Sequence, residues 1–118
     1  MRTRITRSYE LQCAHHLPNV PEGHKCGNVH GHTWLVEITV GGKVDPQSGW
    51  FMDFADVDDV WKRRVHNVLD HRDLNVLIPN PTTENLCSWI VLALLPELPG
   101  LARVAARENR RSCVTLDL

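Results

Sequence analysis

Polar and apolar residues alternate along two segments in the first third of the chain. Between Thr3 and Cys13 the apolar side chains fall on odd positions, namely Ile5, Tyr9, Leu11 and Cys13. After a loop that contains proline and glycine, the alternation returns at Trp34, Val36, Ile38 and Val40. A period of two residues is typical of a strand with one buried face. The pattern therefore predicts two strands that present apolar rows to the same core.

A different spacing follows Asp53, where apolar residues recur every three or four positions. They are Phe54, Val57, Trp61, Val65, Val68 and Leu69. This spacing places them on one face of a helix that Asp53 directly precedes. Acidic residues crowd the first turns and Lys62, Arg63 and Arg64 follow, an order that the helix dipole favours. The acidic cluster is thus explained without a metal.

A second helix is predicted to begin at Thr82 or Thr83 and to end before Pro96. It is apolar nearly all round, so it must be covered by the domain's own sheet or by another subunit. Two further strands are predicted over 101–108 and 113–118. The order strand-strand-helix-helix-strand-strand indicates an α+β fold, with a four-stranded antiparallel sheet and both helices on one face. At 118 residues we expect one domain, 1–118.

Composition removes several classes of function. Thirteen Lys and Arg against fourteen Asp and Glu give a formal net charge of −1, so no basic field favours nucleic acid. The longest apolar run, Trp89 to Leu95, is far shorter than the roughly 18 residues of a membrane span. No apolar stretch follows the charges at the N-terminus, so we expect a cytoplasmic protein without a membrane partner. The four cysteines then indicate reduced thiols rather than a disulfide framework.

The seven histidines include three that the strand pattern brings together. His30 and His32 share a face of the second strand, and His15 continues the apolar face of the first. If the two strands pair as an antiparallel hairpin, the three imidazoles converge, as a zinc site requires. An isolated His-Gly-His is more often an exposed pair than a metal site. Because His15 lies on the matching face, the metal site is favoured here.

Cys26 admits two interpretations. It could be a fourth ligand that closes a purely structural zinc site, or it could act as a base or nucleophile beside an open metal position. Its neighbours Lys25 and Gly27 are polar or flexible, which is unusual for a core cysteine. Spacing does not choose between the two. Cys13, Cys87 and Cys113 are interpreted as small buried hydrophobes.

Three other polar features have ordinary explanations. Asp70 beside His71 suits a proton relay, but a histidine at a helix C-terminus is also plain dipole compensation. Glu108 ends a predicted strand, and from the residues alone a solvated strand end is preferred over a pocket carboxylate. The remaining histidines are expected on the surface, and they are His16, His24 and His66.

Longer motifs extend these patterns. They include Cys13-Ala-His-His-Leu-Pro, Pro21-Glu-Gly-His-Lys-Cys-Gly-Asn-Val-His-Gly-His, Met52-Asp-Phe-Ala-Asp, Leu69-Asp-His, Pro81-Thr-Thr-Glu-Asn and Arg107-Glu108. In this order they resemble the 6-pyruvoyl tetrahydropterin synthase family. The short Cys-x-x-x-His-Gly-His spacing is most similar to its bacterial branch, the 6-carboxy-5,6,7,8-tetrahydropterin synthases of queuosine biosynthesis.

The resemblance implies a role for each matching residue. It implies that His15, His30 and His32 hold Zn²⁺ and that Cys26 abstracts a proton without binding the metal. It also implies that Asp70 and His71 form the proton relay. Glu108 is implied to anchor the pterin, with Thr82 and Thr83 among the substrate-binding residues.

The resemblance also implies a fold, an assembly and a reaction. The fold is the tunnelling fold, in homo-hexamers built from two trimers with active sites between subunits. The reaction converts 7,8-dihydroneopterin triphosphate to 6-carboxy-5,6,7,8-tetrahydropterin, with loss of acetaldehyde and triphosphate. The alternatives are a 6-pyruvoyltetrahydropterin synthase, which only eliminates triphosphate, a sister enzyme that cleaves dihydroneopterin, and a noncatalytic structural zinc domain.

Overall fold

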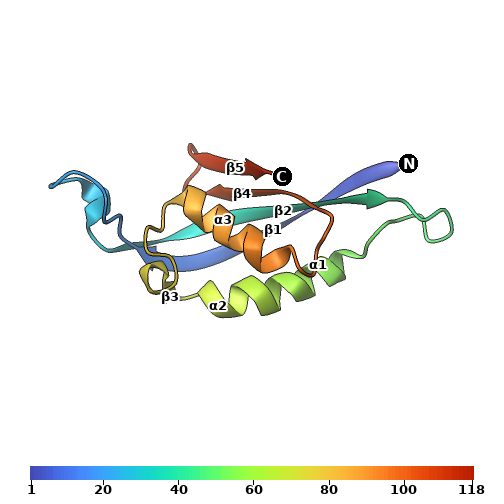
Figure 1. Cartoon of the computed structure of the whole chain (residues 1–118), viewed down its shortest axis with the longest axis horizontal. Helices are drawn as coiled ribbons and strands as arrows, with labels where there is room; N and C mark the ends of the chain where they lie inside the picture. Colours follow the sequence, from blue (N-terminus) through green and yellow to red (C-terminus); the bar gives the residue numbers. More distant parts are fainter.

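Five strands form one sheet in the computed structural model, which describes residues 1–118. The strands are β1 (Arg2–His15), β2 (His30–Lys43), β3 (Arg72–Asp73), β4 (Leu101–Arg107) and β5 (Cys113–Asp117). Their order across the sheet is β3-β1-β2-β4-β5. The long β1–β2 pair gives the molecule an elongated shape of 58 × 25 × 22 Å (Figure 1).

The two alternating segments pair as the sequence predicts. β1 and β2 are antiparallel along their whole length, from Arg2 opposite Lys43 to His15 opposite His30. Predicted inward side chains such as Leu11 and Trp34 are fully buried, and Ile5 and Tyr9 are partly buried against the same core. The parity of the apolar residues therefore fixes which face of the hairpin meets the core.

The predicted four-stranded antiparallel sheet is wrong in one respect. A fifth strand, β3, lies parallel to β1, with Cys13 opposite Arg72 and Ala14 opposite Asp73. The sheet is therefore mixed. Two residues are too few to produce an alternating pattern, so β3 has no signature in the sequence.

The first helical run covers the predicted residues in three parts. They are α1 (Phe54–Trp61), a π-helical segment η2 (Lys62–His66) and α2 (Asn67–Leu69). Asp53 caps the run, since its carboxylate accepts a hydrogen bond from the Ala55 N–H at 2.9 Å. Residues at four-residue steps, including Trp61, Val65 and Leu69, are buried. Such a stripe drifts by about 40° per step around an α-helix, and the wider π turn reduces that drift.

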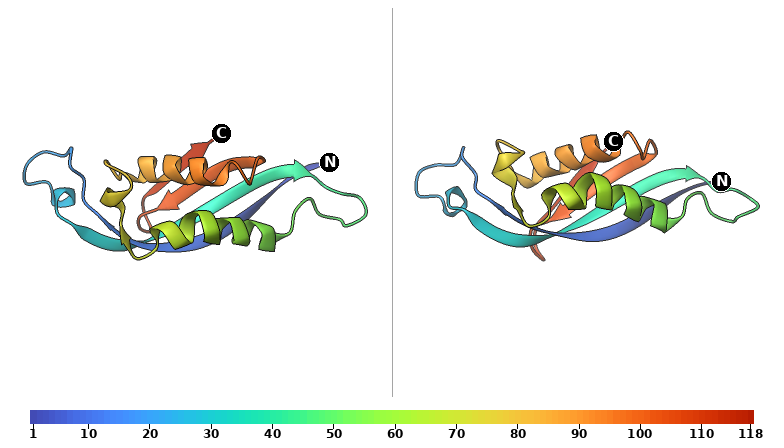
Figure 2. Two further views of the ribbon diagram at one scale, coloured as in Figure 1. Left: turned by 60° about the horizontal axis from the view of Figure 1, so that its bottom comes forward. Right: turned by 90° about the horizontal axis from the view of Figure 1, so that it is seen from below.

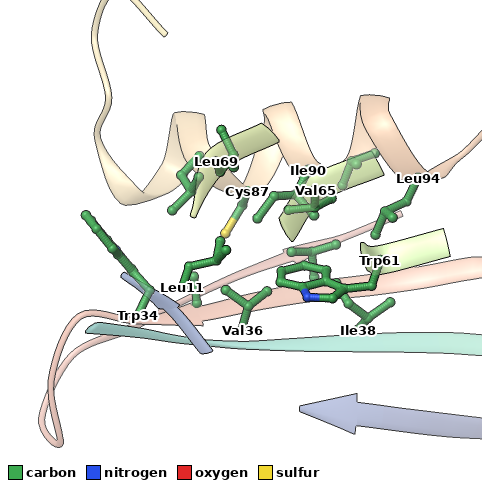
Figure 3. Close-up of a cluster of buried hydrophobic side chains, with 14 of the residues drawn as sticks. Leu11, Trp34, Val36, Ile38, Trp61, Val65, Leu69, Cys87, Ile90 and Leu94 are labelled. Atoms are coloured by element: carbon green, nitrogen blue, oxygen red, sulfur yellow. The ribbon is translucent and has the colours of Figure 1, made fainter. Parts of the chain in front are cut away.

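The second helix, α3 (Thr83–Leu94), begins at the predicted position. The Thr82 hydroxyl accepts a hydrogen bond from the Asn85 N–H at 3.1 Å. Both helical runs lie on the same face of the sheet (Figure 2). Between the two layers, apolar side chains of the sheet meet those of the helices, as Figure 3 shows for Val36, Ile38 and Ile90. The two-layer α+β arrangement is thus confirmed.

The nearly uniformly apolar helix α3 is covered on one side only. The domain's own sheet covers one side, where Leu86, Ile90 and Leu94 are fully buried. On the other side Leu92 is 75% exposed. No helix has the length and the apolar content that crossing a membrane requires.

The thiols divide in a way that corrects one expectation. Cys13 and Cys87 are buried as predicted, and burial raises the pKa of each thiol to about 11. Cys113, at the start of the edge strand β5, is exposed, so the expectation that it is a buried residue is wrong.

Candidate functional site

Three imidazoles gather at the end of the β1–β2 ladder. His15 and His30 form its terminal pair, and His32 lies two residues further along the same face. Their ligand nitrogens all lie within 4.8 Å of one another. The ring of His15 is 4.5 Å from that of His30 and 5.3 Å from that of His32, measured between centroids. The predicted convergence of the three histidines is therefore confirmed.

Hydrogen bonds orient two of the rings. The Nδ1 atoms of His15 and His30 lie 2.8 Å from the carbonyl oxygens of Pro81 and Asn28. Because a carbonyl only accepts, each Nδ1 must carry the proton, which leaves the lone pair on Nε2. A ring nitrogen fixed in this way is the usual arrangement of a metal-ligating histidine.

Burial adds to this effect at His15, which is only 2% exposed. Desolvation lowers the pKa of His15, and the Pro81 carbonyl opposes that shift only in part. The imidazole is thereby kept in the neutral form that binds a metal ion. Three neutral nitrogen donors suit Zn²⁺ and leave a fourth position open.

The loop before β2 positions Cys26. A turn at Gly23, where φ is +84°, lets the His24 N–H donate to the Pro21 carbonyl at 3.0 Å. The short helix η1 (Lys25–Gly27) follows. The Nδ1 atom of His24 then accepts from the Cys26 N–H at 3.1 Å, and the Cys26 carbonyl accepts from the Leu17 N–H at 2.7 Å. Sequence reasoning assigned no role to His24, which is an exposed residue that fixes the backbone of Cys26.

Cys26 opens into a cavity of about 430 Å³ beside the histidines. Its lining residues are Lys25, Cys26, His30, His32, Glu108 and Asn109. The Cys26 thiol is not among the ligand atoms that lie within 4.8 Å of one another. This placement favours a chemical role in the cavity over a fourth metal bond.

Glu108 is tied to α3 although the residue is exposed. The Thr83 hydroxyl, on a side chain that is 3% exposed, donates a hydrogen bond to the Glu108 carboxylate. Glu108 also lines a second cavity, of about 350 Å³, together with Thr83 and Arg111. Glu108 is thus exposed at the end of β4, as the residues alone suggested, but its carboxylate is bonded to α3 and lies where two cavities meet.

Asp70 and His71 lie elsewhere. His71 Nδ1 donates to the Asp70 carboxylate at 2.7 Å, and the His71 side chain is 78% exposed. The pair adjoins β3, and His71 lines a third cavity, also of about 430 Å³, that includes His32 but not Cys26. Within one chain the candidate residues thus form two groups, one around Cys26 and Glu108 and one around His71.

Backbone geometry sets His71 apart as well. Its φ is +60°, and it is the one residue other than glycine with a positive φ. This conformation costs roughly 1–2 kcal/mol for a residue with a Cβ. It turns the chain from the helix into β3, where the His71 N–H donates to the Gln12 carbonyl at 2.6 Å.

Two of the histidines expected on the surface are partly buried. Asn75 holds His16 through its backbone, accepting from the His16 N–H at 2.9 Å and donating to the His16 carbonyl at 3.0 Å. His66 lies 3.6 Å from the Asp70 carboxylate. Asn75 is far from His16 in the sequence, and Asp70 lies one helical turn after His66. A scan for local motifs therefore detects neither contact.

Comparison with known proteins gives this geometry a family. Residues 4–117 match the family described as 6-pyruvoyl tetrahydropterin synthase. The chain belongs to this family. The resemblance inferred from the motif between Cys26 and His32 is thereby confirmed, and the chain is a member of a family of enzymes.

Relatives and structural neighbours agree with this assignment. A protein of Archaeoglobus fulgidus, provisionally named 6-carboxy-5,6,7,8-tetrahydropterin synthase, is 41% identical over 86% of this chain and 84% of its own. The dihydroneopterin monophosphate aldolase of Pyrococcus furiosus is 34% identical over 99% of both chains. The 6-pyruvoyl tetrahydropterin synthase structure of Caenorhabditis elegans superimposes with a TM-score of 0.89 at 23% identity, covering 100% of this chain and 96% of that one. The last match concerns the fold alone.

Proposed function

We propose that the chain is a zinc-dependent carbon–carbon lyase. In this proposal it converts 7,8-dihydroneopterin triphosphate to 6-carboxy-5,6,7,8-tetrahydropterin, releases acetaldehyde and triphosphate, and serves queuosine biosynthesis. The observation that carries the proposal is the cavity that joins Cys26, two of the clustered histidines and Glu108. The similarity to the Archaeoglobus fulgidus protein supports the choice of the carboxy branch.

His15, His30 and His32 would hold the zinc ion. The donor set fits, because carbonyl groups orient the rings of His15 and His30 and the ligand nitrogens of all three lie within 4.8 Å of one another. When bound, the ion supplies Lewis-acid polarisation of the substrate's side-chain hydroxyls.

Side chains of the protein remove the proton and bind the pterin ring. Cys26, as a thiolate, removes a carbon-bound proton of the substrate side chain. Glu108 accepts two hydrogen bonds from the guanidine-like edge of the pterin, and Thr83 holds its carboxylate in place. Since Glu108 lines both cavities, we place the pterin ring in the smaller one and its side chain in the cavity of Cys26.

The proton relay of Asp70 and His71 is assigned to a neighbouring subunit. His71 shares no cavity with Cys26 in its own chain, and its imidazole is largely exposed. The outer edge of β5, the edge of β1 outside its two-residue pairing with β3, and the exposed Leu92 offer surfaces for association. We therefore propose a homo-hexamer of two trimers, with sites shared between subunits.

A product assay tests the reaction. The purified zinc-loaded protein is incubated with dihydroneopterin triphosphate, and the products are identified by mass spectrometry. Acetaldehyde together with the carboxylated pterin supports the carboxy branch, and triphosphate release without acetaldehyde identifies a pyruvoyl synthase. Because the Pyrococcus furiosus relative is named an aldolase, dihydroneopterin and its monophosphate are included, and a retro-aldol product would replace the proposal.

A variant separates the lyase from a structural zinc domain. Cys26→Ala is expected to retain one zinc per chain and the same unfolding temperature while turnover is abolished, because Cys26 lies outside the histidine group. Loss of zinc together with folding would show that the thiol is a metal ligand. His15→Ala serves as the control, since it removes a buried ligand and should lower zinc content.

A further inference from the structure

The Asp70 carboxylate has more partners than a two-residue relay needs. Its Oδ1 accepts from the Gln12 backbone N–H at 2.9 Å, and its Oδ2 accepts from His71 Nδ1 at 2.7 Å. A second imidazole stands at the same Oδ2 atom, where His66 Nε2 lies 3.6 Å away. The side chain of Asp70 is only 16% exposed, so these groups form its immediate surroundings.

The helix brings His66 to this position. His66 is the last residue of the π-helical segment, and its carbonyl accepts from the Asp70 N–H at 2.9 Å. Residues four apart lie on the same helix face, so the side chains of His66 and Asp70 are neighbours. His66 also lines a cavity of about 340 Å³ together with Trp61 and Lys62.

We propose that His66 is a positioning residue of the relay, which places a second imidazole against the Asp70 oxygen that His71 uses. The inference rests on the proposed function, in which Asp70 and His71 move the substrate's protons. A carboxylate with one anchored oxygen can still turn its other oxygen away from its partner. When protonated, His66 is an ion-pair partner that opposes that rotation and favours the anionic carboxylate, which must be charged to orient and stabilise His71.

The electrostatics of Asp70 agree with this geometry. Desolvation opposes ionisation, but the pKa of Asp70 is still lowered, because the Gln12 N–H, His71 and His66 outweigh it. Other charged or titratable groups surround the cluster on neighbouring elements, and they are Tyr9, Glu10, Cys13, His32, Asp58, Lys62, Arg72 and Asp73. Among the imidazoles of the chain, only those of His66 and His71 lie within ion-pair distance of Asp70.

The test compares three variants of the full chain. His66→Leu removes the imidazole, and His66→Gln retains a hydrogen-bond donor. Lys62→Leu is the control, because it removes a full charge from the same cavity without contacting Asp70. For each variant, kcat and KM are measured with dihydroneopterin triphosphate, and the Asp70 carboxyl is titrated by carbon-13 NMR.

We expect His66→Leu to lower kcat about fivefold with KM unchanged, because the relay is misaligned while the substrate site is intact. The Asp70 carboxyl should titrate at higher pH in this variant, and the acid limb of the kcat profile should move with it. His66→Gln should recover most of kcat, and Lys62→Leu should change neither quantity. This set of results supports the inference.

Two results overturn it. An unchanged Asp70 titration in His66→Leu would show that the imidazole does not act on the carboxylate. A shifted titration with unchanged kcat would show that the contact does not position the relay. If the wild type turns over no pterin, the proposed function fails, and the titration still decides whether His66 acts on Asp70.

Discussion

At the scale of single residues, Thr83 matters as much as Glu108, the carboxylate to which it donates a hydrogen bond. Its hydroxyl is buried at the start of α3 and donates to Glu108, which is otherwise exposed at the end of β4. A carboxylate at a strand end without a hydrogen-bond partner samples many rotamers. A bidentate contact with a pterin requires one particular rotamer. The hydrogen bond therefore acts as preorganisation.

Thr83→Val is expected to lower kcat/KM by about tenfold, mainly through KM, because the anchor carboxylate loses a charge-assisted hydrogen bond. Steady-state kinetics with dihydroneopterin triphosphate measure the change. Thr83→Ser keeps the hydroxyl and should retain near wild-type KM. Equal KM values in the valine variant and the wild type would show that Glu108 does not depend on Thr83.

Asp70 and Glu108 also show what single residues reveal without a structure. Neighbours in the sequence suggested that Asp70 pairs with His71, and the contact exists. The partner of Glu108 lies 25 positions away, in a different element. No local pattern encodes such a pair, so the residues alone favoured a solvated end, and only the resemblance to a family indicated a pocket.

At the scale of elements, ion pairs hold the π-helical segment to the loop after α3. Glu97 accepts hydrogen bonds from both Arg63 and Arg64, and Arg63 also contacts Asp59 at 2.9 Å. These two arginines lower the pKa of Glu97 to about 2. The segment that carries His66 is thus bound to the loop after α3 through one carboxylate.

Because the pKa of Glu97 is lower in the folded state, its contribution to stability is complete above the usual carboxyl range and disappears as pH falls towards about 2. Glu97→Gln should therefore have a lower unfolding temperature than the wild type at neutral pH, and the difference should shrink in acid. Thermal unfolding followed by circular dichroism from pH 7 to about 2 measures it.

Asp117→Asn provides the comparison, since it breaks a single exposed pair with Arg103. It should change the unfolding temperature less than Glu97→Gln does. A difference for Glu97→Gln that does not depend on pH would show that the network contributes by packing alone.

The sequence predicted those elements in which the pattern of apolar residues repeats several times. The alternation in β1 and β2 and the four-residue stripe from Val57 to Leu69 each repeat several times, so both faces were assigned correctly. β3 and the π turn depend on tertiary contact and have no period of their own. The same parity placed His15, His30 and His32 together, whereas the loop that fixes Cys26 follows from hydrogen bonds that only the fold brings about.

At the scale of the whole molecule, the separation of Cys26 from His71 predicts complementation. Cys26→Ala and His71→Ala should each be inactive as pure proteins, and a mixture refolded together should regain partial turnover. Some sites in the mixed oligomer then combine an intact Cys26 from one chain with an intact His71 from its neighbour. Native mass spectrometry checks that the subunits have mixed.

The matched control pairs Cys26→Ala with Glu108→Ala, whose side chains line one cavity of the same chain. No site in that mixture contains both groups, so no turnover should return. An inactive mixture of the first pair, with mixing demonstrated, would place His71 in the same site as the Cys26 of its own chain.

The histidine cluster also has a consequence for how the hairpin forms. His15 and His30 are the last pair of the β1–β2 ladder, and a slip of one residue would turn one strand's side chains to the opposite face. An ion that requires all three imidazoles can be bound by the native pairing only. Metal binding would therefore select the correct register at this end of the hairpin during folding.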